Sequence, residues 1–321
     1  MSGYLLDREG TARPRIDRAA IESLLTSGEF FWLDLHDPDE DEYRLLRDTF
    51  GFHALAIEDS EQFGQRPKLE QYEDFVFLVL YGAAPPPDKD RLVEVHCFYS
   101  EHYLVTVRKE DAPGCTMLRQ RYERRPARLA RPIVLLYQLA DALADSFFPA
   151  LADFDDRIDA VQDEILASPT DRHLNEILAM RRRLILLRRA VTPQRDLVGQ
   201  FVGGLSDLPG LDREAERYFR DVYDHLIRVT DLIDSYRDLL TSVMDVYLST
   251  ISNRLNAVMK RLTLITTVAL PLVVMTGFFG QNFGFLVRHI SSWPAFVGYG
   301  VVLPLAGLAL LAVFLRRRGV W

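Results

Sequence analysis

The pattern of hydrophobic and polar residues divides the chain into a long charged part and an apolar end. Two uncharged runs lie close together near the C-terminus, Leu262 to Phe279 and Trp293 to Leu315. At 1.5 Å per residue the first run makes a helix of about 27 Å, close to the roughly 30 Å thickness of a hydrocarbon core. The sequence therefore predicts a transmembrane hairpin: a first membrane helix within 262–284, a loop at 285–292, and a second helix with a basic tail at 293–321.

The charges beside the two runs predict their orientation. Lys260 and Arg261 precede the first run, and three arginines at 316–318 follow the second. Because lysine and arginine are retained on the cytoplasmic side of a membrane, we expect both termini in the cytoplasm and the loop outside. Arg288 in the loop is the one charge that opposes this orientation.

Short strand patterns dominate the first part of the chain. Four segments are rich in β-branched and aromatic residues. They are 30–35, 75–83, 92–99 and 103–108. A helix is expected from Asp37-Pro38 onward, since proline suits a first helical turn and acidic residues follow it. These signals predict an α/β domain with a mixed sheet over residues 1–130.

Long helices are predicted after this domain. An acidic stretch, 152–164, is joined by a turn signal at Ser168-Pro169-Thr170-Asp171 to a basic stretch, 177–190. Opposite charges on two helices joined by a tight turn favour an antiparallel pair with complementary faces, which we place at 131–209.

A stalk helix is predicted for residues 210–261, continuing into the first membrane run. Between Gly210 and Gly277 there is no glycine, and Pro271 is the one proline. Apolar residues from Phe219 to Tyr247 recur at spacings of three and four. This pattern fits either a coiled-coil-like seam or an ordinary amphipathic helix, and both remain open.

Composition narrows the function. The net charge of −8 argues against nucleic-acid binding and suits a protein that handles cations. The two cysteines, Cys97 and Cys115, form no CxxC motif, which excludes a zinc finger or a disulfide framework. No phosphate-binding GxxxxGK[ST] motif is present. The histidines of the first domain lack nucleophile motifs or metal-ligand spacing, so we expect no enzyme.

One face of the predicted stalk and first membrane helix carries polar and small residues. Its members are Asp245, Ser252, Asn256, Met259, Thr263, Thr266, Leu270, Val273 and Gly277. Polar residues on one face of a membrane helix contact either a partner helix or water, so packing and pore lining both remain open. In a pore, Met259, Leu262 and Leu270 would be apolar constrictions that gate by dewetting. Two helices cannot enclose water, so a pore needs several copies around an axis.

The first run ends in Gly280-Gln281-Asn282 after an aromatic residue. This tripeptide resembles the Gly-Met-Asn signature of the CorA family of divalent metal-ion (magnesium/cobalt) transporters. Stretches similar to CorA sequences occur in the same order along the chain: FWLDLHDPDEDE, LEQYEDFVFLVL, YFRDVYDH and DVYLSTISNRLNAVMKRLT. The resemblance covers the chain from about residue 30. It implies a funnel-shaped homopentamer of a bacterial inner membrane that carries Mg²⁺, with Co²⁺, Ni²⁺ or Zn²⁺ as other candidate ions.

The resemblance also implies roles for individual residues. Gly280, Gln281 and Asn282 would form the selectivity region, where five Asn282 amides accept hydrogen bonds from a hydrated ion that dehydrates reluctantly. By the same resemblance, Asp221 would bind regulatory magnesium between subunits. A partner acid would be Asp88 or Asp90, and Asp224 would add to the field. Loss of this ion at low internal magnesium would loosen the stalks and wet the constriction.

Three departures from the family pattern leave the ion preference open. Gln281 replaces the usual methionine, Val273 stands where relatives often carry threonine, and the outer loop has Arg288 and His289 but no acid. These features keep two alternatives: a ZntB-like zinc transporter, with or without proton coupling, and a non-conducting membrane-anchored metal sensor.

Overall fold

The computed structural model describes residues 3–7, 12–13, 17–84, 91–124, 131–281 and 284–317. They form two compact units, Met1–Asp245 and Val246–Trp321. A single helix, α9 (Arg213–Phe279), passes from the first unit into the second. The long uninterrupted helix predicted from the lack of glycine and proline is therefore confirmed.

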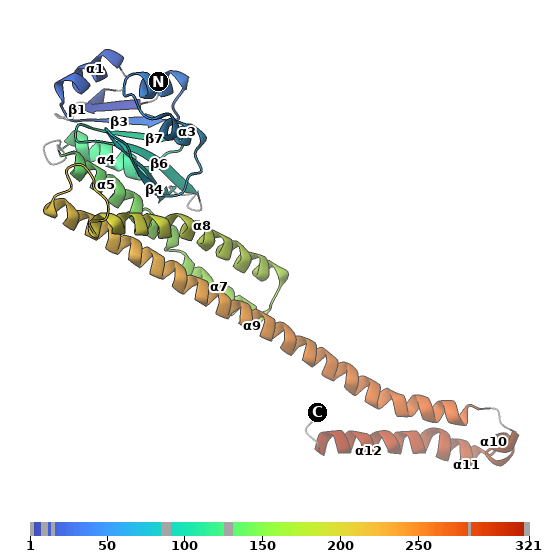
Figure 1. Cartoon of the computed structure of the whole chain (residues 1–321). Helices are drawn as coiled ribbons and strands as arrows, with labels where there is room; N and C mark the ends of the chain where they lie inside the picture. Colours follow the sequence, from blue (N-terminus) through green and yellow to red (C-terminus); the bar gives the residue numbers. More distant parts are fainter. Residues whose placement is uncertain are drawn as a thin grey trace. The chain divides into compact units, whose positions relative to one another are not determined.

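Unit one contains a seven-stranded sheet (Figure 1). The sheet is mixed, as predicted. Its order is β2-β1-β3-β7-β6-β5-β4; β3 and β7 pair in parallel, and the other neighbours are antiparallel. The strands are β1 (Gly3–Asp7), β2 (Ala12–Arg13), β3 (Phe31–His36), β4 (Lys68–Gln71), β5 (Val76–Ala83), β6 (Leu92–Tyr99) and β7 (Tyr103–Arg108).

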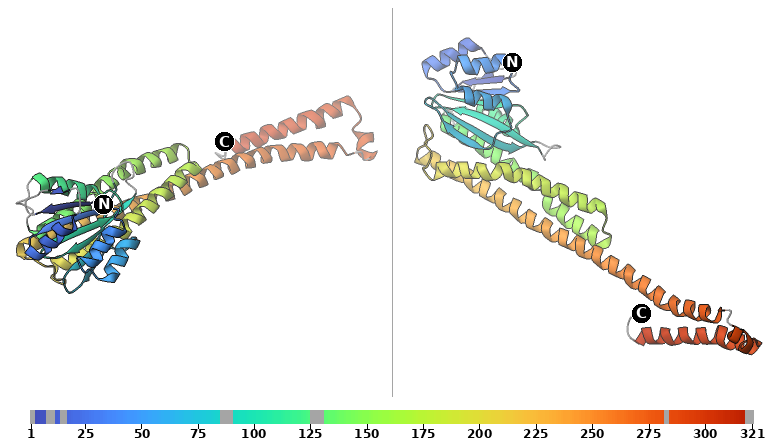
Figure 2. Two further views of the ribbon diagram at one scale, coloured as in Figure 1. Left: turned by 90° about the horizontal axis from the view of Figure 1, so that it is seen from above. Right: turned by 45° about the vertical axis from the view of Figure 1, so that its right-hand side comes forward.

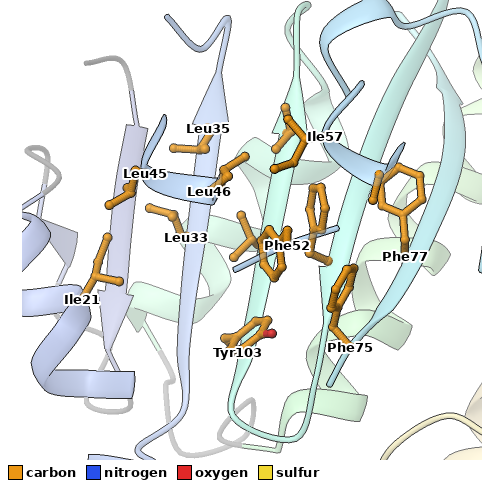
Figure 3. Packing of buried hydrophobic residues seen from close by; sticks show 14 of the residues in the cluster. Ile21, Leu33, Leu35, Leu45, Leu46, Phe52, Ile57, Phe75, Phe77 and Tyr103 are labelled. Atoms are coloured by element: carbon orange, nitrogen blue, oxygen red, sulfur yellow. The ribbon is translucent and has the colours of Figure 1, made fainter. Parts of the chain in front are cut away.

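Helices cover both faces of this sheet. One face carries α1 (Arg18–Ser27), α2 (Glu40–Asp48) and α3 (Ala54–Gln62), and α4 (Pro113–Arg124) and α5 (Pro132–Asp145) lie on the other (Figure 1). The core between the sheet and helices α1 to α3 is rich in aromatic residues. The ring of Phe52 stacks on that of Phe98, with ring centroids 4.2 Å apart, and lies beside Phe75 (Figure 3). Each fully buried side chain of this size contributes about 1.5–3 kcal/mol.

The start of α2 lies slightly later than the sequence predicted. Asp39 caps the helix by accepting from the backbone N–H of Glu42, whose side chain accepts from the backbone N–H of Asp39. Asp37 adopts φ 50°, a left-handed conformation, and so lies outside the helix. The reciprocal cap satisfies two free backbone donors and makes Glu40, three residues after Asp37, the first residue of the helix.

The predicted antiparallel pair consists of α7 (Phe154–Ala167) and α8 (Asp171–Val202), preceded by the short α6 (Phe147–Leu151). Figure 2 shows α7 and α8 side by side. Their contact differs from the predicted attraction between an acidic and a basic face. One ion pair between them joins Arg157 of the acidic helix to Glu176 of the basic one, and Nε2 of His173 in α8 lies 3.2 Å from Oε2 of Glu164 in α7. Apolar residues such as Ile158 are buried between the charges. Most of the remaining charges point to solvent because burying them would cost more than the pairing returns.

The apolar seam of α9 is buried inside a single chain. Val222, Leu226, Val229 and Ile233 have no measurable exposure. The ring of Tyr236 stacks on that of Phe154 in α7, with centroids 5.6 Å apart. The burial of this seam against helices of the same chain supports the ordinary amphipathic helix.

Unit two contains the end of α9, then α10 (Gly284–His289), α11 (Trp293–Ala295), the π-helix η2 (Phe296–Val302) and α12 (Leu303–Arg317). The loop predicted at 285–292 therefore contains a short helix. The π-helix ends just before Pro304, which has no N–H to donate and whose ring would collide with the carbonyl one turn earlier. A wider helical turn at this point avoids that collision.

Three helical stretches of the described chain are long and apolar enough to cross a membrane: Pro132–Ala167, Arg213–Phe279 and Trp293–Arg317. Half of the most apolar window of the first is buried inside the structure, whereas none of the corresponding windows of the other two is. The first stretch therefore belongs to the core of unit one. The other two contain the membrane helices predicted from the sequence.

Candidate functional site

The predicted face with polar and small residues, from Asp245 to Gly277, lies on α9, and we call it the stripe. It has no covering partner among the described residues. Its members from Ser252 to Gly277 are all exposed. Exposure is 59% at Met259, 59% at Leu270 and 63% at Val273. A beta carbon added at Gly277 would meet no atom within 4 Å. An exposed apolar and hydroxyl-bearing face of this extent requires a partner or a filled space outside the single chain.

The second membrane helix covers the opposite face of α9. Leu264, Val268, Leu272, Met275 and Phe279 are partly buried. The ring of Phe279 stacks on that of Tyr299 in η2, with centroids 5.8 Å apart. At about 100° per residue, the centre of this partly buried set lies about 180° from the centre of the stripe. The stripe is therefore not sealed by the chain's own second helix.

The hydroxyl hydrogen of Thr266 is already used within α9. Its Oγ1 donates to the carbonyl oxygen of Leu262 at 2.9 Å. A hydroxyl that donates to its own helix keeps its lone pairs free and can only accept from a further partner. A hydrated cation presents water hydrogens outward, so an outward-facing acceptor of this kind suits it.

The signature tripeptide follows the end of α9 directly. The N–H of Gly280 donates to the carbonyl oxygen of Thr276 at 2.9 Å, which closes the helix. Gln281 lines a cavity of about 280 Å³ together with Phe279, Ile290 and Tyr299. Gln281 therefore lies beside the loop and second helix of its own chain. The predicted selectivity residue Asn282 lies outside the described residues.

A second candidate site lies in unit one, where α5 packs near α9. Nδ1 of His225 lies 3.0 Å from Oδ1 of Asp145 and 3.5 Å from Oδ1 of Asp141. Nε2 of the same ring lies 3.9 Å from Oδ1 of Asp221. We call these four residues the acid–histidine cluster. One oxygen or nitrogen from each of Asp141, Asp145 and His225 fits within 4.8 Å, so the three can hold a metal ion.

Electrostatics inside the acid–histidine cluster favour a cation. Burial, followed by the charge of Asp145, raises the pKa of Asp141 above its ordinary value. Burial and the charges of Asp141 and Asp221 raise the pKa of Tyr137 to about 12. Within the described structure, the buried Oδ1 of Asp141 and Nδ1 of His225 make no hydrogen bond of acceptable geometry despite their short distances. Bound positive charge would offset the repulsion and give these atoms a partner.

The cluster contains one of the predicted regulatory residues, and another lies outside it. Asp221 lies at its edge, whereas Asp224 is exposed and is not part of it. Asp88 and Asp90 lie outside the described residues. Sequence reasoning missed Asp141, Asp145 and His225. The available signals were two i,i+4 pairs, one on each of two helices, but the sequence does not show that these helices meet.

Comparison with known proteins gives a consistent match over nearly the whole chain. Residues 27–317 match the family described as CorA-like Mg²⁺ transporter protein. YfjQ of Bacillus subtilis is 33% identical over 90% of this chain and 89% of its own length. The cobalt/magnesium transport protein CorA of Thermotoga maritima is 33% identical over 85% of this chain and 77% of its own. The structure of the CorA magnesium transporter of Methanocaldococcus jannaschii matches 99% of this chain and 98% of its own, with a TM-score of 0.83 and 21% identity.

Proposed function

The chain belongs to the family of CorA-like Mg²⁺ transporter proteins, and from this premise we propose that it is one subunit of a homopentameric channel that admits magnesium to the cytosol. Family membership makes it a membrane-embedded transporter of divalent cations. Because the members of this family transport ions, the prediction that the chain is not an enzyme is confirmed. The choice of magnesium, the pentamer, the bacterial inner membrane and the cytoplasmic termini are parts of the proposal.

The observation that carries this proposal is the exposed stripe opposite the second membrane helix. In a ring of copies, each α9 can turn this stripe toward a common axis while its own second helix lies outside. The axis would then be lined by hydroxyl acceptors such as Thr266 and by apolar rings at Met259 and Leu270. A divalent cation entering across a potential of 100 mV gains about 4.6 kcal/mol, so no other energy source is needed.

Flux into proteoliposomes tests the proposal. Purified full-length protein is reconstituted, and entry of Mg²⁺, Co²⁺, Ni²⁺ and Zn²⁺ is measured with an imposed potential, with and without a pH gradient. We expect potential-driven Mg²⁺ entry that is independent of the pH gradient. Entry of Zn²⁺ alone, driven by protons, would support the zinc-transporter alternative instead, and no flux of any ion would support the sensor.

Regulation by cytosolic magnesium is part of the same proposal, and we assign it to the acid–histidine cluster, which includes Asp221. Three carboxylates close together repel one another, and a divalent ion removes that repulsion only while it is bound. Carboxylate oxygens suit Mg²⁺, whereas the imidazole of His225 also suits Co²⁺, Ni²⁺ and Zn²⁺. Asp88 or Asp90 of a neighbouring subunit would complete the ligand set. Ion loss would then loosen the stalks and open the constriction at Met259 and Leu262.

The Asp141→Asn variant tests the cluster through stability. Because the folded state raises the pKa of Asp141, ionisation of this carboxyl destabilises the metal-free fold. This penalty is complete above the raised pKa and disappears as the pH falls below the ordinary value of 3.8. At pH 7 without metal we therefore expect a higher Tm in the variant, by roughly 2–4 °C for each kcal/mol recovered.

Addition of Mg²⁺ or Co²⁺ should raise the Tm of the wild type and have much less effect on Asp141→Asn. Asp224→Asn is the matched control, because it removes an exposed carboxylate outside the cluster. Thermal unfolding of the detergent-solubilised protein, followed with and without divalent ions, provides the measurement. Equal metal-induced stabilisation in all three proteins would show that the cluster does not bind the regulatory ion.

A further inference from the structure

A large basic cavity lies in unit one, outside both sites described above. It has a volume of about 890 Å³ and lies between the turn at 64–67, strands β5 and β6, helix α8 and one residue of α9. Five arginines line it: Arg66, Arg181, Arg188, Arg189 and Arg237. Among the described residues, none that lines it is acidic. Such a cavity repels divalent cations, so cation transport does not explain it.

The positive charge of the cavity is only partly neutralised. Oδ1 of Asp234 lies 2.9 Å from Nη1 of Arg237 and 3.5 Å from Nη1 of Arg188. Arg66, Arg181 and Arg189 form no ion pair with any residue in the described ranges. Asp234 therefore neutralises at most part of the charge of two of the five guanidinium groups. The field of the other arginines is concentrated by the concave wall.

Hydrogen bonds between neighbouring elements hold the walls of this cavity in place. The side chain of Gln194 ties α8 to strand β5: its Oε1 accepts from the N–H of Tyr81 at 2.6 Å, and its Nε2 donates to the carbonyl oxygen at 3.1 Å. The carboxylate of Glu94 accepts from the backbone N–H groups of Gly64 and Gln65 at 2.6 and 2.9 Å. Gly64 adopts φ 78°, which suits glycine and sets the turn. The arginines thus extend from a fixed frame rather than from a loose surface.

The spacing of the α8 residues puts charge and apolar surface on one wall. Arg181, Ile185, Arg188 and Arg189 follow one another at i, i+4, i+7 and i+8, which is one face of a helix. Ile185 and Leu186 are 41% and 47% exposed although they are apolar. The cavity thus offers guanidinium groups and an apolar wall together, within the size range of small-molecule sites.

From these features we propose that the cavity binds a triphosphate group, as carried by a nucleoside triphosphate whose base lies against the apolar wall. Guanidinium groups recognise phosphate through paired N–H donors in a fixed planar fork, and several of them can share a chain of phosphates. The acidic helix α7 of a neighbouring copy is the competing occupant, and the experiment below excludes or reveals it.

The test is a binding titration on the full-length protein in detergent, with EDTA present so that triphosphates do not act by removing divalent ions. ATP and inorganic tripolyphosphate are each titrated by calorimetry. We expect both to bind the wild type, and the Arg181→Gln/Arg189→Gln variant to bind each at least tenfold more weakly. The Arg172→Gln/Arg182→Gln variant removes two exposed arginines of the same helix that do not line the cavity, and should bind like the wild type.

The two probes separate the sources of the triphosphate group. Tighter binding of ATP than of tripolyphosphate, lost in Ile185→Ser, supports a nucleotide; equal binding of both supports the phosphate chain alone. Absence of binding to the wild type, or equal weakening in both double variants, overturns the proposal. Absence of binding together with dissociation of the oligomer in Arg181→Gln/Arg189→Gln would assign the cavity to α7 of a neighbouring subunit. None of these outcomes bears on ion flux measured without nucleotide, so the proposed channel stands or falls separately.

Discussion

Modification of a cysteine placed at Thr266 will stop divalent-cation flux, whereas modification of a cysteine placed at Ile265 will leave flux intact. At about 100° per residue, Thr266 lies about 20° from the centre of the stripe and Ile265 about 120° from it. Both side chains are exposed in the single chain, so only the direction of each distinguishes them. A methanethiosulfonate that carries a fixed trimethylammonium charge would place several positive charges around the axis, and these repel an entering divalent ion.

The natural cysteines allow this experiment in the wild-type background. Cys97 and Cys115 are fully buried, and burial raises the pKa of both thiols, so little reactive thiolate forms. Flux into proteoliposomes is measured before and after treatment with the reagent, and the untreated variants report any effect of the substitutions themselves. Loss of flux in Ile265→Cys but not in Thr266→Cys would mean that the stripe faces lipid or another helix, and the pore would have to be placed elsewhere.

The sequence predicted elements whose signal is local. Segments 92–99 and 103–108 became β6 and β7 without change, because alternating aromatic and β-branched residues suit a buried sheet. Strand β4 was missed because its four residues, Lys68–Gln71, are polar or only partly buried. Its place in the sheet depends on antiparallel pairing with β5, which a propensity does not show.

The residues of the candidate sites also divide into those with a local signal in the sequence and those that depend on tertiary contacts. The stripe could be predicted, because the phase of a long helix carries a pattern from Asp245 to Gly277 without any knowledge of tertiary contacts. The acid–histidine cluster could not, since it depends on α5 bringing Asp141 near His225 of α9. The basic cavity was hidden for a similar reason. The charge of α8 was assigned to pairing with α7, whereas those two helices pack mainly through apolar side chains such as Ile158 and leave Arg181 unpaired among the described residues.

Replacement of Asn282 by alanine is expected to lower magnesium flux at limiting ion concentration by at least tenfold. If each subunit contributes one amide to the outer opening, the variant removes a complete ring of neutral acceptors. Magnesium gives up its bound water reluctantly. Its entry therefore depends on groups that accept hydrogen bonds from that water. A tenfold loss corresponds to about 1.4 kcal/mol in total, which is modest for the loss of several hydrogen bonds to a charged, hydrated ion.

Gln281→Met is the matched control for this experiment, because it changes the neighbouring residue of the same tripeptide. Gln281 lines the cavity beside Phe279 and Tyr299 of its own chain, so its replacement by an apolar side chain of similar length should change flux less than twofold. Concentration dependence of Mg²⁺ and Co²⁺ entry into proteoliposomes would measure both variants. Unchanged flux in Asn282→Ala together with a large loss in Gln281→Met would transfer ion recognition from the asparagine to the glutamine. The amide that distinguishes this chain from the usual signature would then be the one that contacts the ion.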